Sequence, residues 1–213
     1  EISCSLVGSE MCIRDRTDTF PAKYNTQVNR YDDKNIEGYK LERATAPITI
    51  TTDASKNVIR VYYVKDWFKY TINYYYDGVI DTSATINDKA AFGTTIKYTD
   101  KVQPGFKFVK ADGSPLVISV NEAANVINVY YQSNSYAYTV EYYYDGIIDT
   151  EKTEKSAAKY NSVVNDYTDK CDTGYKFEKV EGLPLTIATD ESKNVIRVYS
   201  VSYTHLTLPT IRL

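Results

Sequence analysis

Alternation of apolar and polar residues is the dominant pattern along this chain. In the segment 138–144 the intervening positions, including Tyr143, should face solvent, because successive side chains of a strand point to opposite faces. The other parity should face the core and consists of Tyr138, Val140, Tyr142 and Tyr144. Asp145-Gly146 follows at once, and Asp-Gly between apolar strands predicts a two-residue hairpin turn. The pattern therefore predicts a strand, a tight turn and a return strand from Ile147.

The rest of this segment predicts further short strands. Gly174 and the segment 182–184 indicate turns, and each is followed by a short strand pattern. Pro184 suits the start of a strand, where no ladder N–H is required. The final apolar run has Ile196 and Val198 on the inward parity. The middle part, 156–164, fits either a short helical turn or a broken strand. About five strands in roughly 70 residues predict a mainly β module with a thin core.

The whole pattern occurs three times. Segment 70–82 recurs at 138–150, an offset of 68 residues, and the terminal segment 57–62 recurs at 125–130 and 194–199. Self-similarity of this kind predicts tandem modules that pack on their neighbours. We expect a truncated first repeat at 17–66, a second repeat at 67–135 and a third at 136–200, with a short polar linker at 133–135.

Both ends of the chain resemble non-native sequence. Residues 11–15 can be written as the codons ATG TGT ATA AGA GAC, whose reverse complement translates as Val-Ser-Tyr-Thr-His, the sequence of 201–205. The segments 6–15 and 201–210 resemble translated adapters from sequencing-library preparation. We therefore exclude 1–16 and 201–213 from the fold prediction. This exclusion removes His205, the single histidine, and leaves Cys171 as the one remaining cysteine.

Composition limits the chemistry that the repeats can perform. Without a native histidine there is no Ser-His or Cys-His nucleophile system. A lone Cys171 forms neither an intramolecular disulfide nor a structural zinc site. The pairs Asp77 with Asp81 and Asp145 with Asp149 fall short of the roughly six to eight oxygens of a calcium site. We predict no enzymatic activity, no catalytic or metal-binding residues and no cofactor.

Net charge and hydropathy limit the classes of partner that the chain can bind. The formal net charge of −3, with the two signs interspersed, argues against a nucleic-acid partner, which needs a concentrated basic face. No apolar run is long enough to cross a bilayer, so we expect no membrane insertion of this fragment. The unusual feature is the 22 tyrosines, which suit pleated, half-buried strands.

Tyrosines on the outward parity are the candidate ligand-binding residues. A flat aromatic ring with a hydroxyl can stack on a sugar ring and hydrogen-bond it, and tyrosine is common at interfaces. If the first and last strands are neighbours, each complete repeat presents a patch of two tyrosines. The alternative is that these rings form cross-strand pairs that stabilise a small sheet, or pack between modules. The candidates are Tyr62, Tyr75, Tyr130, Tyr143 and Tyr199.

Three motifs together resemble a known family. They are Tyr-Thr-Val-Glu-Tyr-Tyr-Tyr-Asp-Gly at 138–146, the central Gly174-Tyr175, and Asn-Val-Ile-Arg-Val-Tyr at 194–199. They resemble the mucin-binding-protein (MucBP) repeat of Gram-positive surface proteins, over both complete copies and most of the first. The resemblance implies a β-grasp-like module in a secreted, wall-attached adhesin that binds host glycoprotein or glycan weakly and multivalently. The alternative is a purely structural stalk that projects a distal domain from the cell.

Overall fold

The computed structural model describes residues 17–203 and is mainly β, which confirms the predicted fold class. Helical structure within this described part consists of short 3-10 turns only. No helix among these residues has the length and apolar character needed to cross a membrane. The turns are η1 (Ala54–Lys56), η2 (Glu122–Ala124) and η3 (Glu191–Lys193).

The chain divides into two compact units, and the division falls inside the second repeat. The first unit holds the residues up to Asn73 together with Thr82–Thr99 and Ala111–Val129. The second unit holds Tyr74–Asp81, Asp100–Lys110 and the residues from Tyr130 onward. Each junction between consecutive repeats therefore lies within one compact unit.

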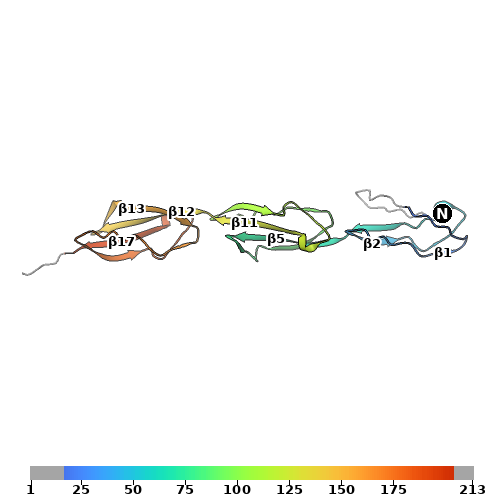
Figure 1. The fold of residues 1–213 in the computed structure, drawn as a ribbon, viewed down its shortest axis with the longest axis horizontal. Helices are drawn as coiled ribbons and strands as arrows, with labels where there is room; N and C mark the ends of the chain where they lie inside the picture. The colour runs from blue at the N-terminus through green and yellow to red at the C-terminus, as the bar shows by residue number, and fades with distance from the viewer. Residues whose placement is uncertain (1–16, 204–213) are drawn as a thin grey trace, which may run out of the picture. The chain divides into compact units, whose positions relative to one another are not determined.

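The third repeat contains a four-stranded sheet of order β13-β12-β17-β15 and a separate pair, β14 with β16 (Figure 1). The first strand, β12, and the last strand, β17, are parallel neighbours, and Tyr143 is in register with Tyr199. The β12–β13 turn has φ of 49° at Asp145 and 82° at Gly146, as the Asp-Gly pair predicts. The strands are β12 (Ser135–Tyr144), β13 (Ile147–Lys159), β14 (Val163–Val164), β15 (Tyr175–Glu181), β16 (Leu185–Thr186) and β17 (Val195–Ser202).

The second repeat has the same order of elements. Its main sheet has the order β6-β5-β11-β9, with β7 also paired to β5, and β8 pairs with β10. The turn between β5 and β6 again has positive φ at Asp77 and Gly78. The strands are β5 (Trp67–Tyr76), β6 (Val79–Ile80), β7 (Ile86–Ala91), β8 (Thr95–Ile96), β9 (Phe106–Asp112), β10 (Leu116–Val117) and β11 (Val126–Ser133).

The first repeat supplies two antiparallel pairs, β2 with β4 and β1 with β3. The buried residues of its hydrophobic cluster are Ile50, Ile59, Val61 and Tyr63. The strands are β1 (Gln27–Val28), β2 (Tyr39–Ala44), β3 (Ile48–Thr49) and β4 (Val61–Lys65).

The core of the third repeat follows the predicted parity. Tyr142 is 1% exposed and its hydroxyl donates to the carbonyl of Thr168 at 2.5 Å, so burial of the ring leaves the phenol paired. Tyr138 and Tyr144 are partly buried against the same cluster. The buried members are Val140, Tyr142, Leu185, Ile187, Ile196 and Val198, which confirms the inward placement of Ile196 and Val198.

The middle segment confirms one of its two predicted alternatives, a broken strand, because β13 ends at Lys159 and β14 follows after a turn. Three other features differ from the sequence prediction. The repeat has six strands, where about five were expected. The expected polar linker at 133–135 is reduced to Asn134, because β11 includes Ser133 and β12 begins at Ser135. β17 runs to Ser202, two residues into the segment expected to be non-native. The proposed adapter origin of 1–16 and 204–213 falls outside the described residues.

Candidate functional site

The outward tyrosines of the third repeat belong to a row that crosses all four strands of its sheet. Tyr143 is in register with Ile148 on one side and with Tyr199 on the other, and Tyr199 is in register with Lys179. The Tyr143 and Tyr199 rings stack with centroids 5.0 Å apart and an interplanar angle of 21°. We call Ile148, Tyr143, Tyr199 and Lys179 the tyrosine row of the third repeat.

The second repeat carries the same row. Tyr75 is in register with Ile80, and its ring stacks on Tyr130 at a centroid distance of 5.0 Å and an angle of 16°. The ammonium of Lys110 lies 5.0 Å from the Tyr130 ring centroid. The tyrosine row of the second repeat therefore consists of Ile80, Tyr75, Tyr130 and Lys110.

The first repeat has one of the five candidate tyrosines, Tyr62. Tyr62 is in register with Arg43, whose guanidinium carbon lies 3.7 Å from the Tyr62 ring centroid. This contact is the counterpart of the lysine–tyrosine contact that ends the other two rows. The structure thus brings Tyr75 together with Tyr130 and Tyr143 together with Tyr199, and places Tyr62 against a cation.

Charged groups border the row in the third repeat. The Tyr143 hydroxyl donates to the Glu141 carboxylate at 3.0 Å, and the Tyr199 hydroxyl donates to Glu181 at 3.1 Å. Lys179 forms an ion pair with Glu181 at 2.7 Å, which raises the pKa of Lys179 and lowers the pKa of Glu181. Both groups are therefore charged at neutral pH and offer one donor and one acceptor beside the rings.

Exposure decides which surfaces of the row are accessible. All five tyrosines are partly exposed, in contrast to the fully solvent-facing rings that the alternation alone suggests. One face of Tyr199 is covered by Tyr143, and the Lys179 ammonium lies 4.6 Å from its centroid. The isoleucines are more open, with Ile80 40% and Ile148 38% exposed. The accessible part of each row is therefore an isoleucine beside the edges of a stacked tyrosine pair.

Sequence reasoning missed the two ends of each row. Ile80 and Ile148 each stand two positions after the glycine of an Asp-Gly turn. The basic ends also recur at fixed spacing, four residues after the aromatic that opens the same strand. These positions are Arg43 after Tyr39, Lys110 after Phe106, and Lys179 after Tyr175. An alignment of the repeats therefore contains the signal that would have identified the isoleucine and the basic residue of each row.

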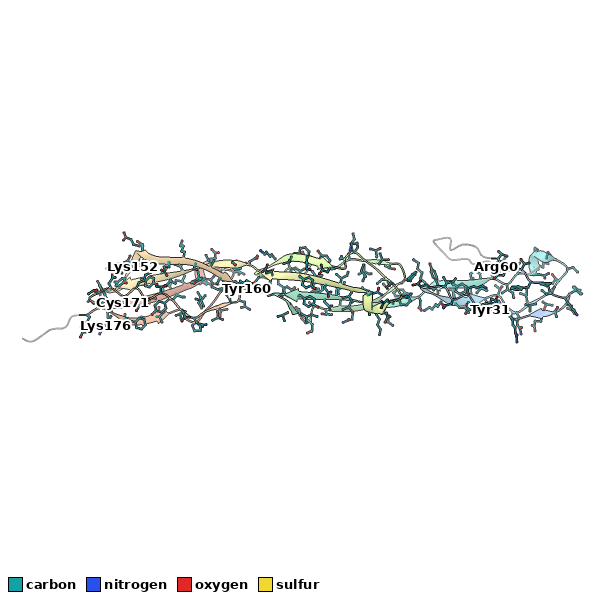
Figure 2. The ribbon with its side chains drawn as sticks, in the orientation of Figure 1. Tyr31, Arg60, Lys152, Tyr160, Cys171 and Lys176 are labelled. Carbon is teal, nitrogen blue, oxygen red and sulfur yellow. The ribbon has the colours of Figure 1, made fainter. Side chains whose placement is uncertain are left out.

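The other candidate groups have structural partners. The Asp145 carboxylate accepts from the N–H of Ser202 at 2.8 Å, and Asp149 accepts from the N–H of Glu151 at 3.0 Å. Cys171 is exposed (Figure 2), as expected for an incidental thiol. Between residues 17 and 203 no group of three or more His, Cys, Asp or Glu side chains is arranged to hold a metal ion.

No protein-family model matches the chain, and no curated protein matches it significantly.

Proposed function

We propose that this chain is a repeat region of an extracellular adhesin attached to the cell wall of a Gram-positive bacterium. In this proposal the tyrosine rows bind host glycoprotein or glycan weakly, and the repeats act together. The observation that carries the proposal is the recurrence of one outward row, with the same apolar, aromatic and basic order, in both complete repeats. Packing of the core does not require the same side chains to recur on the outer face of each repeat. The resemblance to the mucin-binding-protein repeat supports the same reading.

The chemistry of the row suits a carbohydrate. The apolar face of a sugar ring can pack on Ile148 and the neighbouring edge of Tyr143, which removes both from water. Sugar hydroxyls can then exchange hydrogen bonds with Glu181 and Lys179, which lie at the basic end of the row. One row supplies a small contact area, so the affinity of a single site should be low.

The role proposed for the rows is binding without catalysis. Carboxylates near the rows are engaged by phenols and cations, for example Glu141 by Tyr143 and by the Arg197 guanidinium at 3.0 Å. Such pairing holds a surface in one geometry. At the basic end of the row, the hydrogen bonds from Lys179 and Tyr199 lower the pKa of Glu181, which is unsuited to general-acid chemistry at neutral pH.

A spacer function is the second candidate, and a specific observation favours it. Tyr199 is covered on one face by Tyr143 and approached by Lys179, so the pair itself contributes cross-strand stability. A repeat region with that role would project a distal domain from the cell and would need no ligand.

A glycan array separates the two functions. The substitutions Ile80→Ser and Ile148→Ser remove the exposed apolar ends of both rows and leave the stacked tyrosines intact. We expect the doubly substituted chain to lose binding to every glycan that the unsubstituted chain binds. The stronger change Tyr75→Ala with Tyr143→Ala should have the same effect.

The matched control is Val117→Ser with Val163→Ser, because both valines are exposed and lie outside the rows. This control should bind as the unsubstituted chain does, and circular dichroism should show equal folding of all variants. If the unsubstituted chain binds no glycan on the array, the spacer function is favoured. If the control and the test variants lose glycan binding equally, the tyrosine rows are rejected as the binding site.

A further inference from the structure

The first and last strands of the third repeat run side by side in the same direction. β12 pairs with β17 in parallel, with Thr139 opposite Val195 at one end of the pairing and Tyr144 opposite Ser200 at the other (Figure 1). The chain enters the repeat at the start of β12 and leaves it at the end of β17. Because the two strands are parallel, these two points lie at opposite ends of the pairing.

The second repeat has the same pairing between β5 and β11, which are neighbours in its sheet. The N–H of Thr71 donates to the Asn125 carbonyl at 3.0 Å, and the N–H of Asp77 donates to the Tyr131 carbonyl at 3.0 Å. Both bonds join residues with the same separation along the chain, so these two strands are parallel as well. The arrangement is therefore common to both complete repeats.

Side chains reinforce the pairing of β12 with β17. The Arg197 side chain on β17 donates through Nε to the Glu141 carboxylate on β12 at 3.0 Å. The stacked rings of Tyr143 and Tyr199 cross the same boundary. An ion pair and a ring stack thus add to the backbone bonds between these two strands.

The point where the chain enters each repeat is also tied to the end of the repeat. The N–H of Ala137 donates to the Glu191 carboxylate at 2.9 Å, and the N–H of Lys69 donates to the Glu122 carboxylate at 2.8 Å. Each glutamate belongs to the 3-10 turn that precedes the last strand, η3 or η2. The same bond therefore holds the first strand in both complete repeats.

A single residue connects the last strand of the second repeat to the first strand of the third. β11 ends at Ser133 and β12 begins at Ser135. Between them, the Asn134 N–H donates to the carbonyl of Gly105 at 2.8 Å, and the Asn134 carbonyl accepts from the N–H of Tyr160 at 2.8 Å. Tension along the chain therefore passes from β11 to β12 without an intervening linker.

A glycine beneath an aromatic ring makes each junction between repeats close. A Cβ on Gly105 would fall 2.4–2.6 Å from ring atoms of Tyr160, and a Cβ on Gly38 would fall 2.2–2.5 Å from ring atoms of Phe92. Carbon atoms in normal contact are about 3.5–4.0 Å apart, so any other residue would displace the ring. Both glycines are buried.

The direction of the paired strands decides how tension acts on them. Pulling the start of β12 away from the end of β17 slides one strand along the other, so all the bonds between them are stretched at the same time. Two strands that are pulled apart from the same end instead separate one bond after another, which takes less force. Parallel pairing of the first and last strands therefore suits a repeat that has to stay folded under tension.

We propose that the parallel pairing of β5 with β11, and of β12 with β17, is the element that keeps each complete repeat folded when the chain is pulled along its length. A chain that joins a cell wall to a bound ligand is under such tension, and so is a spacer. The proposal therefore does not depend on the ligand of the tyrosine rows.

Single-molecule force spectroscopy on the full chain tests the direction of loading. The molecule has a peptide tag at each end and the substitution Lys193→Cys, at an exposed position just before β17. Its own thiols are removed by Cys4→Ser, Cys12→Ser and Cys171→Ser. When it is held by the two tags, β12 and β17 slide along one another. When it is held by the amino-terminal tag and the thiol at position 193, they separate from one end. We expect the third repeat to unfold at a lower force in the second geometry, and the second repeat to unfold at the same force in both.

The length of chain released identifies the repeat that unfolds. In the second geometry the third repeat releases about 30 Å less chain, because residues 194–202 lie outside the tether at roughly 3.5 Å each. The measurement with both tags uses the same molecule, so it is the control for correct folding. Equal unfolding forces for the third repeat in the two geometries would overturn the proposal.

Two matched substitutions locate the resistance between β12 and β17. Glu141→Ala removes the partner of Arg197 across this pairing and should speed the unfolding of the third repeat at constant force about fivefold, the factor expected for one lost hydrogen bond. The control Glu154→Ala removes the partner of Lys170 on β13, outside the two strands that slide. It should leave the unfolding rate within about twofold. Equal acceleration by both substitutions would overturn the pairing of β12 with β17 as the element that resists tension.

Discussion

At the scale of single residues, each buried tyrosine has two roles: its ring packs in the core, and its hydroxyl holds a surface loop by hydrogen bonds. Tyr63 is buried among aliphatic side chains, and its hydroxyl donates to Asp33 at 2.6 Å and accepts from the N–H of Lys34 at 2.8 Å. Tyr131 uses the corresponding loop, and its hydroxyl accepts from the N–H of Lys101 at 2.9 Å. A tyrosine therefore fills the thin core with its ring and orders a surface loop with its phenol, which phenylalanine could not do.

Tyr142 gives this arrangement a pH dependence. Burial, and next the carboxylate of Glu154, raise the pKa of Tyr142 to about 12 from an ordinary value near 10. Since the folded pKa is the higher one, the stabilisation is complete below about pH 10 and is lost as the pH rises toward 12. We expect Tyr142→Phe to flatten this part of the decline in unfolding free energy, measured by urea denaturation from about pH 9 to 12.

The control for this titration is Tyr24→Phe, because Tyr24 is exposed. It should retain the full decline of the unsubstituted chain. Tyr142→Phe should cost about 1 kcal/mol at neutral pH through the lost hydrogen bond to Thr168. Parallel declines for Tyr142→Phe and the unsubstituted chain would contradict the assignment.

At the scale of elements, a buried asparagine connects segments that are distant in sequence. The Asn194 amide oxygen accepts from the N–H of Ala188 at 2.9 Å, and its amide nitrogen donates to the carbonyls of Ala188 at 2.9 Å and Ala137 at 3.1 Å. Asn125 makes the same bonds to Ser119 and Lys69. One side chain thus ties the first strand of a repeat to the segment that follows its short strand, β10 or β16.

Replacing this asparagine should destabilise its repeat strongly. Asn194→Ala leaves one part-buried N–H and two part-buried carbonyls without the Asn194 side chain as their partner, and a fully buried group that loses its partner costs about 1–3 kcal/mol. We expect a loss of about 2–4 kcal/mol in the unfolding free energy, measured by chemical denaturation. The matched control Asn165→Ala changes an exposed asparagine and should stay within about 0.5 kcal/mol. Similar losses from the two changes would contradict the connecting role.

Elements with local signals were predictable from the sequence. The strand parity around Tyr142 and the Asp145-Gly146 turn depend on neighbouring residues alone, and the structure has both. The parallel pairing of β12 with β17 joins residues more than fifty positions apart, and alternation does not encode which strands become neighbours. The tyrosine patch, and the alternative of cross-strand tyrosine pairs, could therefore be predicted only on the condition that the first and last strands are neighbours.

The missed features share a cause. Asn194, Gly105 and Tyr160 act through contacts made far along the chain, and each alone resembles an ordinary turn or strand-end residue. Their roles become visible when the sequences of the three repeats are aligned. An asparagine, a glycine and an aromatic residue then recur at the positions of Asn194, Gly105 and Tyr160, respectively. The repeat therefore contains the information, and the single module does not.

At the scale of the whole molecule, two complete tyrosine rows in one chain make binding multivalent if each row binds a glycan. When the second row binds after the first, its encounter is intramolecular, and avidity can raise the apparent affinity by about 10²–10⁴-fold without any new contact. A densely glycosylated surface offers ligands at many spacings and therefore permits both rows to bind. A soluble monovalent glycan does not.

This difference yields a prediction for chains with one damaged row. On a dense mucin layer in surface plasmon resonance, Ile80→Ser alone or Ile148→Ser alone should weaken the apparent affinity at least about tenfold, because either change removes the intramolecular step. In calorimetry with a soluble glycan, the same single variants should bind half the number of ligands with an unchanged Kd. Val163→Ser, outside both rows, should leave both measurements unaltered. A merely halved response on the mucin layer would mean that the rows bind independently, and the advantage of carrying the row in tandem would then lie elsewhere than in avidity.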